Sequence, residues 1–305
     1  MMPSLRSRLV KLFLPLTGIK HAFGSEAAMR RAIARDRLAG PALPSQGMRR
    51  RMLIEETRFA GSRVFTVRPR SREAKTHVLY LHGGAFVFDI FWRHWLLIER
   101  LVARTRCSVS VPLYPLAPEH TCQDVFDLLR PLYADLLAMH GAGSIFFMGD
   151  SAGASMSLAL AQQARKSQTA LPAGLALISP ALDMTLSDER QPELARLDPM
   201  LDIPGSRAAG RWYAGARDPA DPLISPLFGS LAGLPPIAVW TGTHDLLNPD
   251  ARRLQAKAAA EGAFVALHEY EAMVHVWPLL RIPEAEQAVG EMADFLQNPT
   301  RVRAS

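Results

Sequence analysis

The chain has 305 residues, of which 49% are hydrophobic and 21% charged, a composition typical of a globular protein and too apolar for a disordered one. No uncharged apolar stretch approaches the roughly 18 residues of a membrane-spanning helix, so no membrane span is expected. The net charge is +6, and the basic excess lies in residues 1–75, which carry 17 Lys and Arg against 5 Asp and Glu. No aromatic residues interleave with Arg49-Arg50-Arg51, so nucleic acid is not an expected partner. Weak attraction to anionic membranes stays open.

The N-terminal segment is the first predicted element. Leucines recur there at helical spacing with basic residues between them, and these leucines are Leu5, Leu9, Leu12 and Leu16. The pattern predicts a short amphipathic helix. Lys11 interrupts the apolar run and Pro15 breaks it, so a signal peptide is not expected.

Beyond residue 50, short apolar runs alternate with segments of helical periodicity. Strands are predicted at 63–68, 77–81, 107–113, 144–149, 174–179, 236–241 and 263–269. Helices are predicted at 92–105, 122–139, 152–165, 249–260 and 284–296. This alternation predicts an α/β protein with a parallel sheet covered on both faces, in which ligands bind beyond the carboxyl ends of the strands.

Two stretches do not fit the alternation, residues 1–50 and about 184–225. An interruption of about 40 residues between two sheet strands is too long for a plain loop and is often functional. We therefore expect N-terminal cap helices in 1–50 and a catalytic domain over 51–305, with a cap insertion at about 184–225. Apolar side chains in this insertion predict an apolar slot, and they are Met200, Leu201, Trp212 and Tyr213.

Cysteine usage bounds the compartment. Cys107 and Cys122 both lie among apolar neighbours and cannot form a disulfide scaffold, so they are interpreted as reduced core thiols. This favours a reducing, cytoplasmic compartment. Cysteine and histidine spacings typical of metal sites are absent from the sequence, and no metal is expected.

The strongest chemical motif is Gly149-Asp150-Ser151-Ala152-Gly153, between a predicted strand and a predicted helix. In this context a G-x-S-x-G motif predicts a nucleophile elbow. The sharp turn strains the backbone of Ser151, and side chains at the flanking positions would collide across it. We therefore predict that Ser151 is a nucleophile; the alternative is a glycine-rich connection with an N-capping serine.

A second motif, His82-Gly83-Gly84-Ala85, follows the strand at 77–81. Acyl transfer requires N–H donors that point at the developing oxyanion, and glycine lets the backbone approach closely. We predict that the N–H groups of Gly83, Gly84 and Ala152 form this oxyanion hole. His82 is interpreted as tying down the loop.

A serine nucleophile needs a base and an orienting carboxylate, which in this type of sheet follow in the order Ser, acid, His. Asp245 lies just past the strand at 236–241 and is preferred as the acid. Its competitor Asp250 follows Asn248 and Pro249, which look like an N-cap and a first helical residue, so Asp250 is interpreted as a first-turn carboxylate.

The base must come from the histidines downstream of the acid's strand. His244 adjoins the acid in sequence and would have difficulty facing it, and His268 falls within the last strand. His275 lies in the loop after that strand, where a base belongs, so it is the predicted base.

With these residues in place, the chain resembles the bacterial hormone-sensitive-lipase-like (family IV) carboxylesterases of the α/β-hydrolase superfamily from about residue 77 to 296. The shared motifs occur in the family's order, and they are His82-Gly83-Gly84, Tyr114-Pro115-Leu116-Ala117-Pro118-Glu119-His120, the Ser151 elbow, Asp221-Pro222-Leu223-Ile224-Ser225-Pro226, Gly242-Thr243-His244-Asp245-Leu246-Leu247 and His275-Val276-Trp277. The resemblance implies a mostly parallel eight-stranded sheet flanked by helices, with a helical cap and no cofactor.

The expected function is therefore hydrolysis of small-to-medium acyl carboxylic esters through an acyl-enzyme intermediate. An amidase or arylacetamide hydrolase, an interfacial lipase and a non-enzymatic small-molecule binding protein are the alternatives, and a homodimer stays open. The sequence departs from the family at Ala85, where a third glycine is usual, and at Val276-Trp277, which is expected to place a large ring near the pocket. Asp150 in the elbow goes, in this family, with an aspartate as the acid, which supports Asp245.

Overall fold

The computed structural model describes residues 3–71 and 75–299. Its centre is an eight-stranded sheet with the strand order β1-β2-β4-β3-β5-β6-β7-β8. The strands are β1 (Met52–Phe59), β2 (Ser62–Pro69), β3 (His77–Leu81), β4 (Ser108–Pro112), β5 (Ile145–Asp150), β6 (Gly174–Ile178), β7 (Ile237–Gly242) and β8 (Val265–Tyr270). The two ladders of β2 are antiparallel and the others parallel, so the expected mostly parallel sheet is confirmed.

The first strand, β1, is absent from the sequence prediction. It forms a hairpin with β2 through Ala60 and Gly61, whose φ angles of 46° and 84° fit the tight turns that join antiparallel strands. Most of its side chains are exposed or half-buried. An edge strand with charged side chains lacks the apolar run by which the central strands are recognised.

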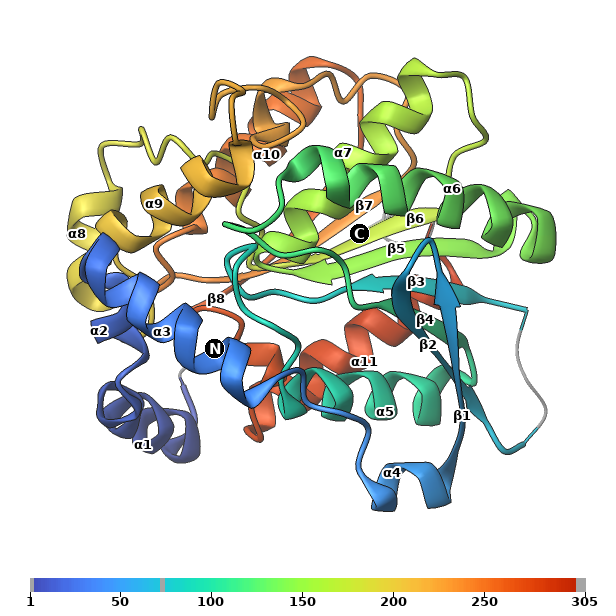
Figure 1. The fold of residues 1–305 in the computed structure, drawn as a ribbon, viewed down its shortest axis with the longest axis horizontal. Helices are drawn as coiled ribbons and strands as arrows, with labels where there is room; N and C mark the ends of the chain where they lie inside the picture. Colours follow the sequence, from blue (N-terminus) through green and yellow to red (C-terminus); the bar gives the residue numbers. More distant parts are fainter. Residues whose placement is uncertain (1–2, 72–74, 300–305) are drawn as a thin grey trace.

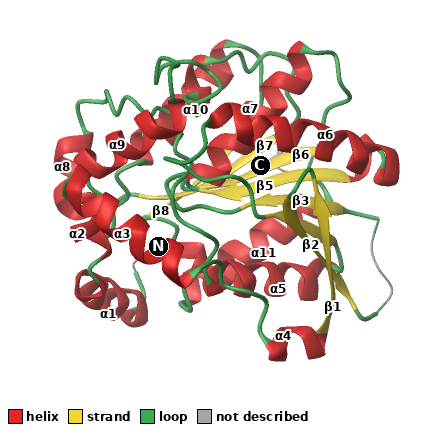
Figure 2. Ribbon diagram, viewed as in Figure 1, coloured by secondary structure: helices red, strands yellow, loops and turns green. Residues whose placement is uncertain are grey.

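Helices cover both faces of the sheet (Figure 2). The flanking helices are α5 (Trp92–Thr105), α6 (Cys122–His140), α7 (Ala152–Lys166), α10 (Asn248–Ala260) and α11 (Pro283–Gln297). Side chains that alternate along a strand enter opposite cores: Leu79 and Leu81 of β3 pack with α6 and α7, whereas Val78 and Tyr80 pack with α5 and α11. Both cores are continuous across β3, β5, β6 and β7, which holds the strand ends rigidly in place.

The two stretches outside the alternation lie side by side (Figure 1). The first contains α1 (Leu5–Phe13), the 3₁₀ helix η1 (Leu14–Thr17), α2 (Ile19–Phe23), α3 (Glu26–Ala39) and α4 (Gln46–Arg51), and the second contains α8 (Gln191–Leu197) and α9 (Ile203–Ala214). Helix α9 packs on α2 and α3. A Cβ at Gly205 would lie 2.5 Å from Cα of Phe23, so α9 approaches the end of α2 as closely as backbones allow. The Lys20 amine adds bonds to the carbonyls of Ala195, Asp198 and Leu201.

Three short 3₁₀ helices complete the structure: η2 (Ala142–Ser144), η3 (Pro226–Phe228) and η4 (Trp277–Leu279). None of the helices in the described part of the chain has the length and apolar character needed to cross a bilayer.

Candidate active site

Ser151 connects β5 to α7 in a strained backbone conformation, with φ 52° and ψ −116°. This is the strain expected of the elbow, because a non-glycine residue rarely adopts positive φ. A Cβ at Gly149 would lie 2.6 Å from the carbonyl oxygen of Gly153 and 2.7 Å from that of Leu81, and one at Gly153 would collide with Leu81. Glycine is therefore required on both sides of the serine, as predicted.

One continuous chain of hydrogen bonds joins the three predicted residues. Nε2 of His275 lies 2.9 Å from Oγ of Ser151, and Nδ1 of His275 lies 3.0 Å from Oδ1 of Asp245. Asp245 follows β7, His275 follows β8, and all three residues are buried, with Ser151 retaining 8% exposure. The same Oδ1 accepts a bond from the Leu247 N–H at 2.9 Å, which fixes the carboxylate.

The competing residues lie elsewhere. The His244 ring contacts the amine of Lys11 on α1, and the ring of His268 stacks on Trp240 within the sheet. Trp277 is also displaced from its expected place near the pocket. It is fully buried between the sheet and helices α5 and α11, where it packs on Tyr270, so its ring belongs to the core.

The charges around His275 favour its protonated form. Burial by itself lowers the pKa of an imidazole, but the Asp245 carboxylate, with further contributions from Asp198 and Asp150, raises the pKa of His275 above its ordinary value of 6.5. A histidine stabilised in this way is well suited to hold the proton that it takes from a serine hydroxyl.

Asp198 is a carboxylate beside this group that the sequence analysis does not identify. It ends α8, and its oxygens accept bonds from the N–H groups of Met200 (2.8 Å), Leu201 (3.1 Å) and Leu246 (2.9 Å). Leu246 directly follows the predicted acid, so one buried side chain joins the insertion to the acid's loop. Burial and the charge of Asp245 raise the pKa of Asp198 to about 6.

The elbow residue Asp150 holds the glycine loop. Its carboxylate accepts bonds from the Tyr80 hydroxyl (2.6 Å) and the Gly83 N–H (3.0 Å), and it contacts Nε2 of His94 at 3.2 Å. Burial opposes the charged form, but these partners together lower the pKa of Asp150. The predicted role of Gly83 as an oxyanion donor is therefore corrected, because its N–H is already bonded to Asp150.

Three other N–H groups remain for an oxyanion. In the described hydrogen bonds, the N–H groups of Gly84, Ala85 and Ala152 donate to no acceptor. Gly84, Ala85 and Phe86 have successive φ angles of 127°, 53° and 66°, which non-glycine residues rarely adopt. His82 bonds the Gly83 carbonyl at 2.7 Å and stacks on Tyr114, in keeping with its interpretation as a loop anchor.

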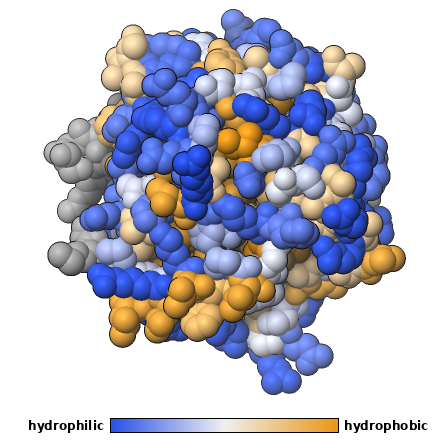
Figure 3. Space-filling view, turned by 90° about the vertical axis from the view of Figure 1, so that its left-hand side faces the viewer, coloured by the Kyte–Doolittle hydropathy of each residue, from blue (hydrophilic) through white to orange (hydrophobic). Residues whose placement is uncertain are grey.

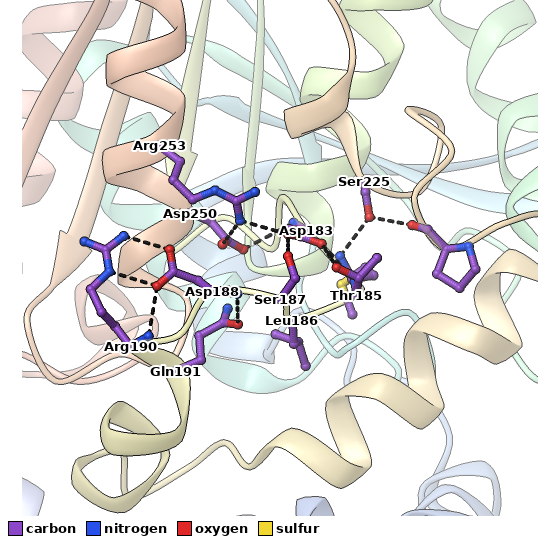
Figure 4. Close-up of polar contacts among 12 residues, drawn as sticks. Asp183, Thr185, Leu186, Ser187, Asp188, Arg190, Gln191, Ser225, Asp250 and Arg253 are labelled. Atoms are coloured by element: carbon purple, nitrogen blue, oxygen red, sulfur yellow. Dashed lines mark hydrogen bonds and ion pairs between the residues drawn. The ribbon is translucent and has the colours of Figure 1, made fainter.

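Asp250 lies in the first turn of α10, as predicted, but its carboxylate is bonded to neighbouring residues in the core. Helix α10 begins at Asn248, which therefore is not its N-cap, and Asp250 is fully buried. Figure 4 shows Asp250 facing Asp183, with Arg253 between the two carboxylates. Oδ2 of Asp250 accepts the Asp183 N–H at 3.2 Å, and Arg253 lies 2.8 Å from Asp183 and 3.4 Å from Asp250.

The two carboxylates of this pair differ in proton affinity. Burial and the charge of Asp183 raise the pKa of Asp250 well above its ordinary value. Burial opposes ionisation of Asp183 too, but the hydroxyls of Thr185 and Ser187 and the Arg253 guanidinium lower the pKa of that residue. We therefore assign the lower pKa of the pair to Asp183 and the higher pKa to Asp250, so Asp250 takes up a proton first as the pH falls.

This assignment predicts unequal effects on stability. Asp183→Asn leaves Arg253 without its nearest charge and is expected to lower the free energy of unfolding by about 3 kcal/mol, the lower end for a buried pair because Arg253 is partly exposed. Asp250→Asn removes the carboxylate that lies farther from Arg253, 3.4 Å against 2.8 Å, and is expected to cost about 1 kcal/mol. Urea unfolding of both variants measures the difference; an equal or reversed cost would contradict the assignment.

The aromatic residues of the insertion hold elements together. The Trp212 ring lies under the guanidinium of Arg30 on α3, and the Tyr213 ring stacks on Phe86 at 4.0 Å. Trp212 is thus not part of an apolar slot. Met200 and Leu201 follow Asp198 by two and three residues, and their N–H groups bond its carboxylate, which ties these two predicted slot residues to the loop of the predicted acid.

Comparison with known proteins agrees with this geometry. A family model described as the α/β-hydrolase fold matches residues 78–279. An esterase of Acinetobacter venetianus is 33% identical over 246 residues, covering 79% of this chain and 81% of that protein. An acetyl-hydrolase of Streptomyces hygroscopicus is 32% identical over 239 residues, covering 77% and 79%. The crystal structure of an esterase from the bacterial hormone-sensitive lipase family has a TM-score of 0.82 at 27% identity, covering 97% and 98%.

Proposed function

We propose a mechanism for this chain as a serine ester hydrolase, because it belongs to the bacterial hormone-sensitive-lipase-like carboxylesterases of the α/β-hydrolase superfamily. The observation that carries the mechanism is the hydrogen-bonded chain from Ser151 through His275 to Asp245. Oγ of Ser151 attacks the ester carbonyl carbon while Nε2 of His275 takes the hydroxyl proton. His275 then returns the proton to the departing alcohol, and Ser151 keeps the acyl group. A water molecule, deprotonated by His275, attacks the acyl-enzyme; His275 then returns that proton to Oγ of Ser151 as the bond to the acyl carbon breaks, and the carboxylic acid is released.

For the oxyanion hole we propose the N–H groups of Gly84, Ala85 and Ala152. Ala152 lies at the first position of α7, where the helix leaves N–H groups unbonded and its dipole favours negative charge. Gly83 instead fixes the loop through Asp150. The elbow aspartate thus positions both halves of the hole, because it neighbours Ser151 in sequence and binds the glycine loop.

Asp198 is proposed as a positioning residue for the acid. Its bond to the Leu246 N–H holds the loop that carries Asp245, and its bonds to Met200 and Leu201 fix the same carboxylate to the insertion. Its negative charge also helps to raise the pKa of His275. Both effects act on substrate turnover only through Asp245 and His275.

The pH dependence of turnover follows from the sign of the His275 shift. His275 must be neutral to act as a base, and its pKa is raised, so kcat/KM for a neutral ester is expected to fall as the pH drops through a midpoint above 6.5. Initial rates with p-nitrophenyl butyrate, measured at constant ionic strength, give the midpoint. A rate that is independent of pH between about 5 and 9, in the range where histidines titrate, would contradict His275 as the base.

Removing the Asp198 charge is expected to move this midpoint. Asp198→Asn takes away one of the charges that raise the pKa of His275, so the acid limb should shift to lower pH while kcat falls. Asp202→Asn is the matched control, because Asp202 lies in the same segment and caps α9 through the Ile203 N–H. An unshifted limb in the Asp198 variant would show that Asp198 has a structural role only.

We propose that the enzyme prefers esters of small-to-medium acyl chains. We also propose that residues 1–50 and about 184–225 form a cap, and that residues 51–305 contain the catalytic domain. The packing of α9 on α2 and α3, together with the burial of Leu201 and the partial burial of Met200 near the site, supports a confined acyl pocket. Each buried methylene contributes about 0.8 kcal/mol until the pocket is full, and overpacking then costs about 1–3 kcal/mol.

A panel of p-nitrophenyl esters from acetate to palmitate, with matching anilides, tests this proposal. Efficiency is expected to peak between butyrate and octanoate, and the anilides are expected to react slowly. A steady rise to palmitate would contradict the confined pocket, and faster hydrolysis of anilides than of esters would indicate an amidase.

For the compartment we propose the cytoplasm, as the burial of both cysteines in the core supports. Fractionation of cells that express the full-length chain tests this. Recovery from the periplasm or the medium would contradict it.

A further inference from the structure

The outward face of α1 has the opposite polarity from that of an ordinary surface helix. A helix on a globular protein normally buries its apolar stripe and exposes its polar one. In α1 the buried residue is Ser7; Val10 and Leu14 pack against the core, whereas five large apolar side chains of α1 and η1 are exposed to solvent. We call these the outer apolar face, and its members are Leu5 (74% exposed), Leu9 (47%), Leu12 (68%), Phe13 (57%) and Leu16 (81%).

Polar anchors on the other side hold the helix in this orientation. The Ser4 hydroxyl caps α1 and donates to Glu284 of α11 at 3.1 Å, and the Ser7 hydroxyl donates to the same carboxylate at 3.1 Å. Lys11 contacts His244, and Leu14 is buried in the core beside α5 and α11. Serine, lysine and leucine on the inner side therefore fix α1 to the body of the protein and leave the outer apolar face without a partner among the described residues.

The face is continuous in space. Leu5, Leu9, Leu12 and Leu16 lie at intervals that place them along one side of a helix. Figure 3 shows a band of apolar residues low on this side of the molecule, at the height at which α1 lies in Figure 1. Contiguous apolar patches of this kind mark interaction sites, in contrast to scattered single residues.

The charge around the face is positive. Residues 3–25 contain Arg6, Arg8, Lys11 and Lys20 and no acidic residue, and both arginines are exposed. The chain beyond residue 75 carries a net charge of −6, so the basic excess lies in residues 1–75, to which this face belongs. An apolar stripe flanked by arginines matches the interface of an anionic bilayer, where leucines enter the acyl boundary and arginines meet lipid phosphates.

A second copy of the chain fits this face less well. A two-fold dimer would place the same patch against itself and bring Arg6 and Arg8 of one copy toward those of the other. The face also has five side chains, whereas a stable protein interface uses about 20–30 residues on each side. A lipid surface needs neither self-complementarity nor that area.

We propose that α1 and η1 dock this enzyme onto anionic lipid surfaces through the outer apolar face. The docked face lies beside the active-site loops, because Lys11 on its inner side contacts His244, the residue before Asp245. This docking proposal rests on the proposed function and narrows the substrate class to esters of medium acyl chains that partition into a membrane. Binding itself requires no catalysis, so it can be tested separately from the mechanism.

The test compares binding of the full-length protein to large vesicles by flotation. Wild-type protein is expected to bind vesicles that contain about one part phosphatidylglycerol to three parts phosphatidylcholine. Its binding to vesicles of pure phosphatidylcholine should be weaker by about tenfold or more, and high salt should release it from the anionic vesicles. The variant Leu9→Ser/Leu12→Ser/Leu16→Ser is expected to lose binding by at least about tenfold while retaining its melting temperature and its turnover of soluble p-nitrophenyl butyrate.

A closely matched control is available. The control positions are Leu53 on β1 (47% exposed), Met139 on α6 (67%) and Leu38 on α3 (89%). The three tested leucines have exposed fractions of 47%, 68% and 81%. The triple serine variant at these positions should bind vesicles like the wild type. Equal binding by the α1 variant, absence of wild-type binding to anionic vesicles, or a wild-type dimer that the α1 variant converts to monomers would each overturn the proposal. The last result would identify a second copy as the occupant.

Discussion

Ser151→Ala is expected to lower kcat for p-nitrophenyl butyrate by about 10⁶-fold, the loss typical of a triad nucleophile. The alanine cannot form the acyl-enzyme, and His275 then has no hydroxyl to deprotonate. The fold should survive, because the backbone bond from the Ser151 N–H to the Ile178 carbonyl (2.8 Å) does not involve the side chain. Alanine also occupies positive φ elsewhere in this chain, at Ala60 and Ala85.

Ser155→Ala is the matched control for this variant. Ser155 lies one turn further along α7, is also buried, and donates to the Ile224 carbonyl at 3.3 Å, away from His275. It should retain turnover within about tenfold, as expected for a residue that makes one neutral hydrogen bond. A fluorophosphonate probe should label the wild type and Ser155→Ala at Ser151 and leave Ser151→Ala unlabelled. Wild-type-like turnover by Ser151→Ala, or labelling at another serine, would contradict the proposed nucleophile.

The parallel part of the sheet could be predicted because each strand is buried on both faces. β3 and β5 consist of apolar side chains that enter two different cores, so their sequence is a short apolar run bounded by polar residues. β1 lacks this signature because it pairs only with β2 at the sheet edge. The packing of α9 on α2 could not be predicted, since contact between segments so far apart depends on the whole fold.

The hydrogen-bonded chain could be predicted because its members follow strands β5, β7 and β8 of a sheet with a fixed connection order. Ser151, Asp245 and His275 each lie just beyond the carboxyl end of a strand, which the local pattern reveals. Asp198 lies in an insertion, and only the path of that insertion brings it to Leu246. Its sequence signal, a carboxylate at the end of α8, is shared by many exposed aspartates.

The error at Gly83 and the unforeseen burial of Asp250 have related causes. The sequence shows that glycine allows close approach at Gly83, but not that its N–H points at Asp150. The position of Asp250 in the first turn of α10 is compatible with solvent exposure, whereas the approach of Asp183 from the loop after β6 buries it. In both cases the partner comes from another strand end, which is a property of the sheet and not of the motif.

Asp245→Asn is expected to lower kcat by about 10⁴-fold, the loss found when a triad carboxylate becomes an amide. The asparagine can still accept the Leu247 N–H, so the loop should keep its shape, but the charge opposite Nδ1 of His275 disappears. The amide can also turn its NH₂ group toward Nδ1, which would place the imidazole proton on Nε2 and prevent it from accepting the Ser151 proton.

The pH profile of the residual activity distinguishes a triad carboxylate from a structural one. Asp245 makes the largest contribution that raises the pKa of His275, so in Asp245→Asn the acid limb should move to lower pH, and further than in Asp198→Asn. Asp250→Asn, five residues along the chain, should leave both kcat and the limb unchanged, because its carboxylate faces Asp183 and Arg253. An inactive Asp250→Asn variant would contradict Asp245 as the partner of His275. Loss of activity in Asp245→Asn without a shifted acid limb would contradict it too. In that case the lost turnover of Asp245→Asn would have to come from a change in the loop that Asp198 holds.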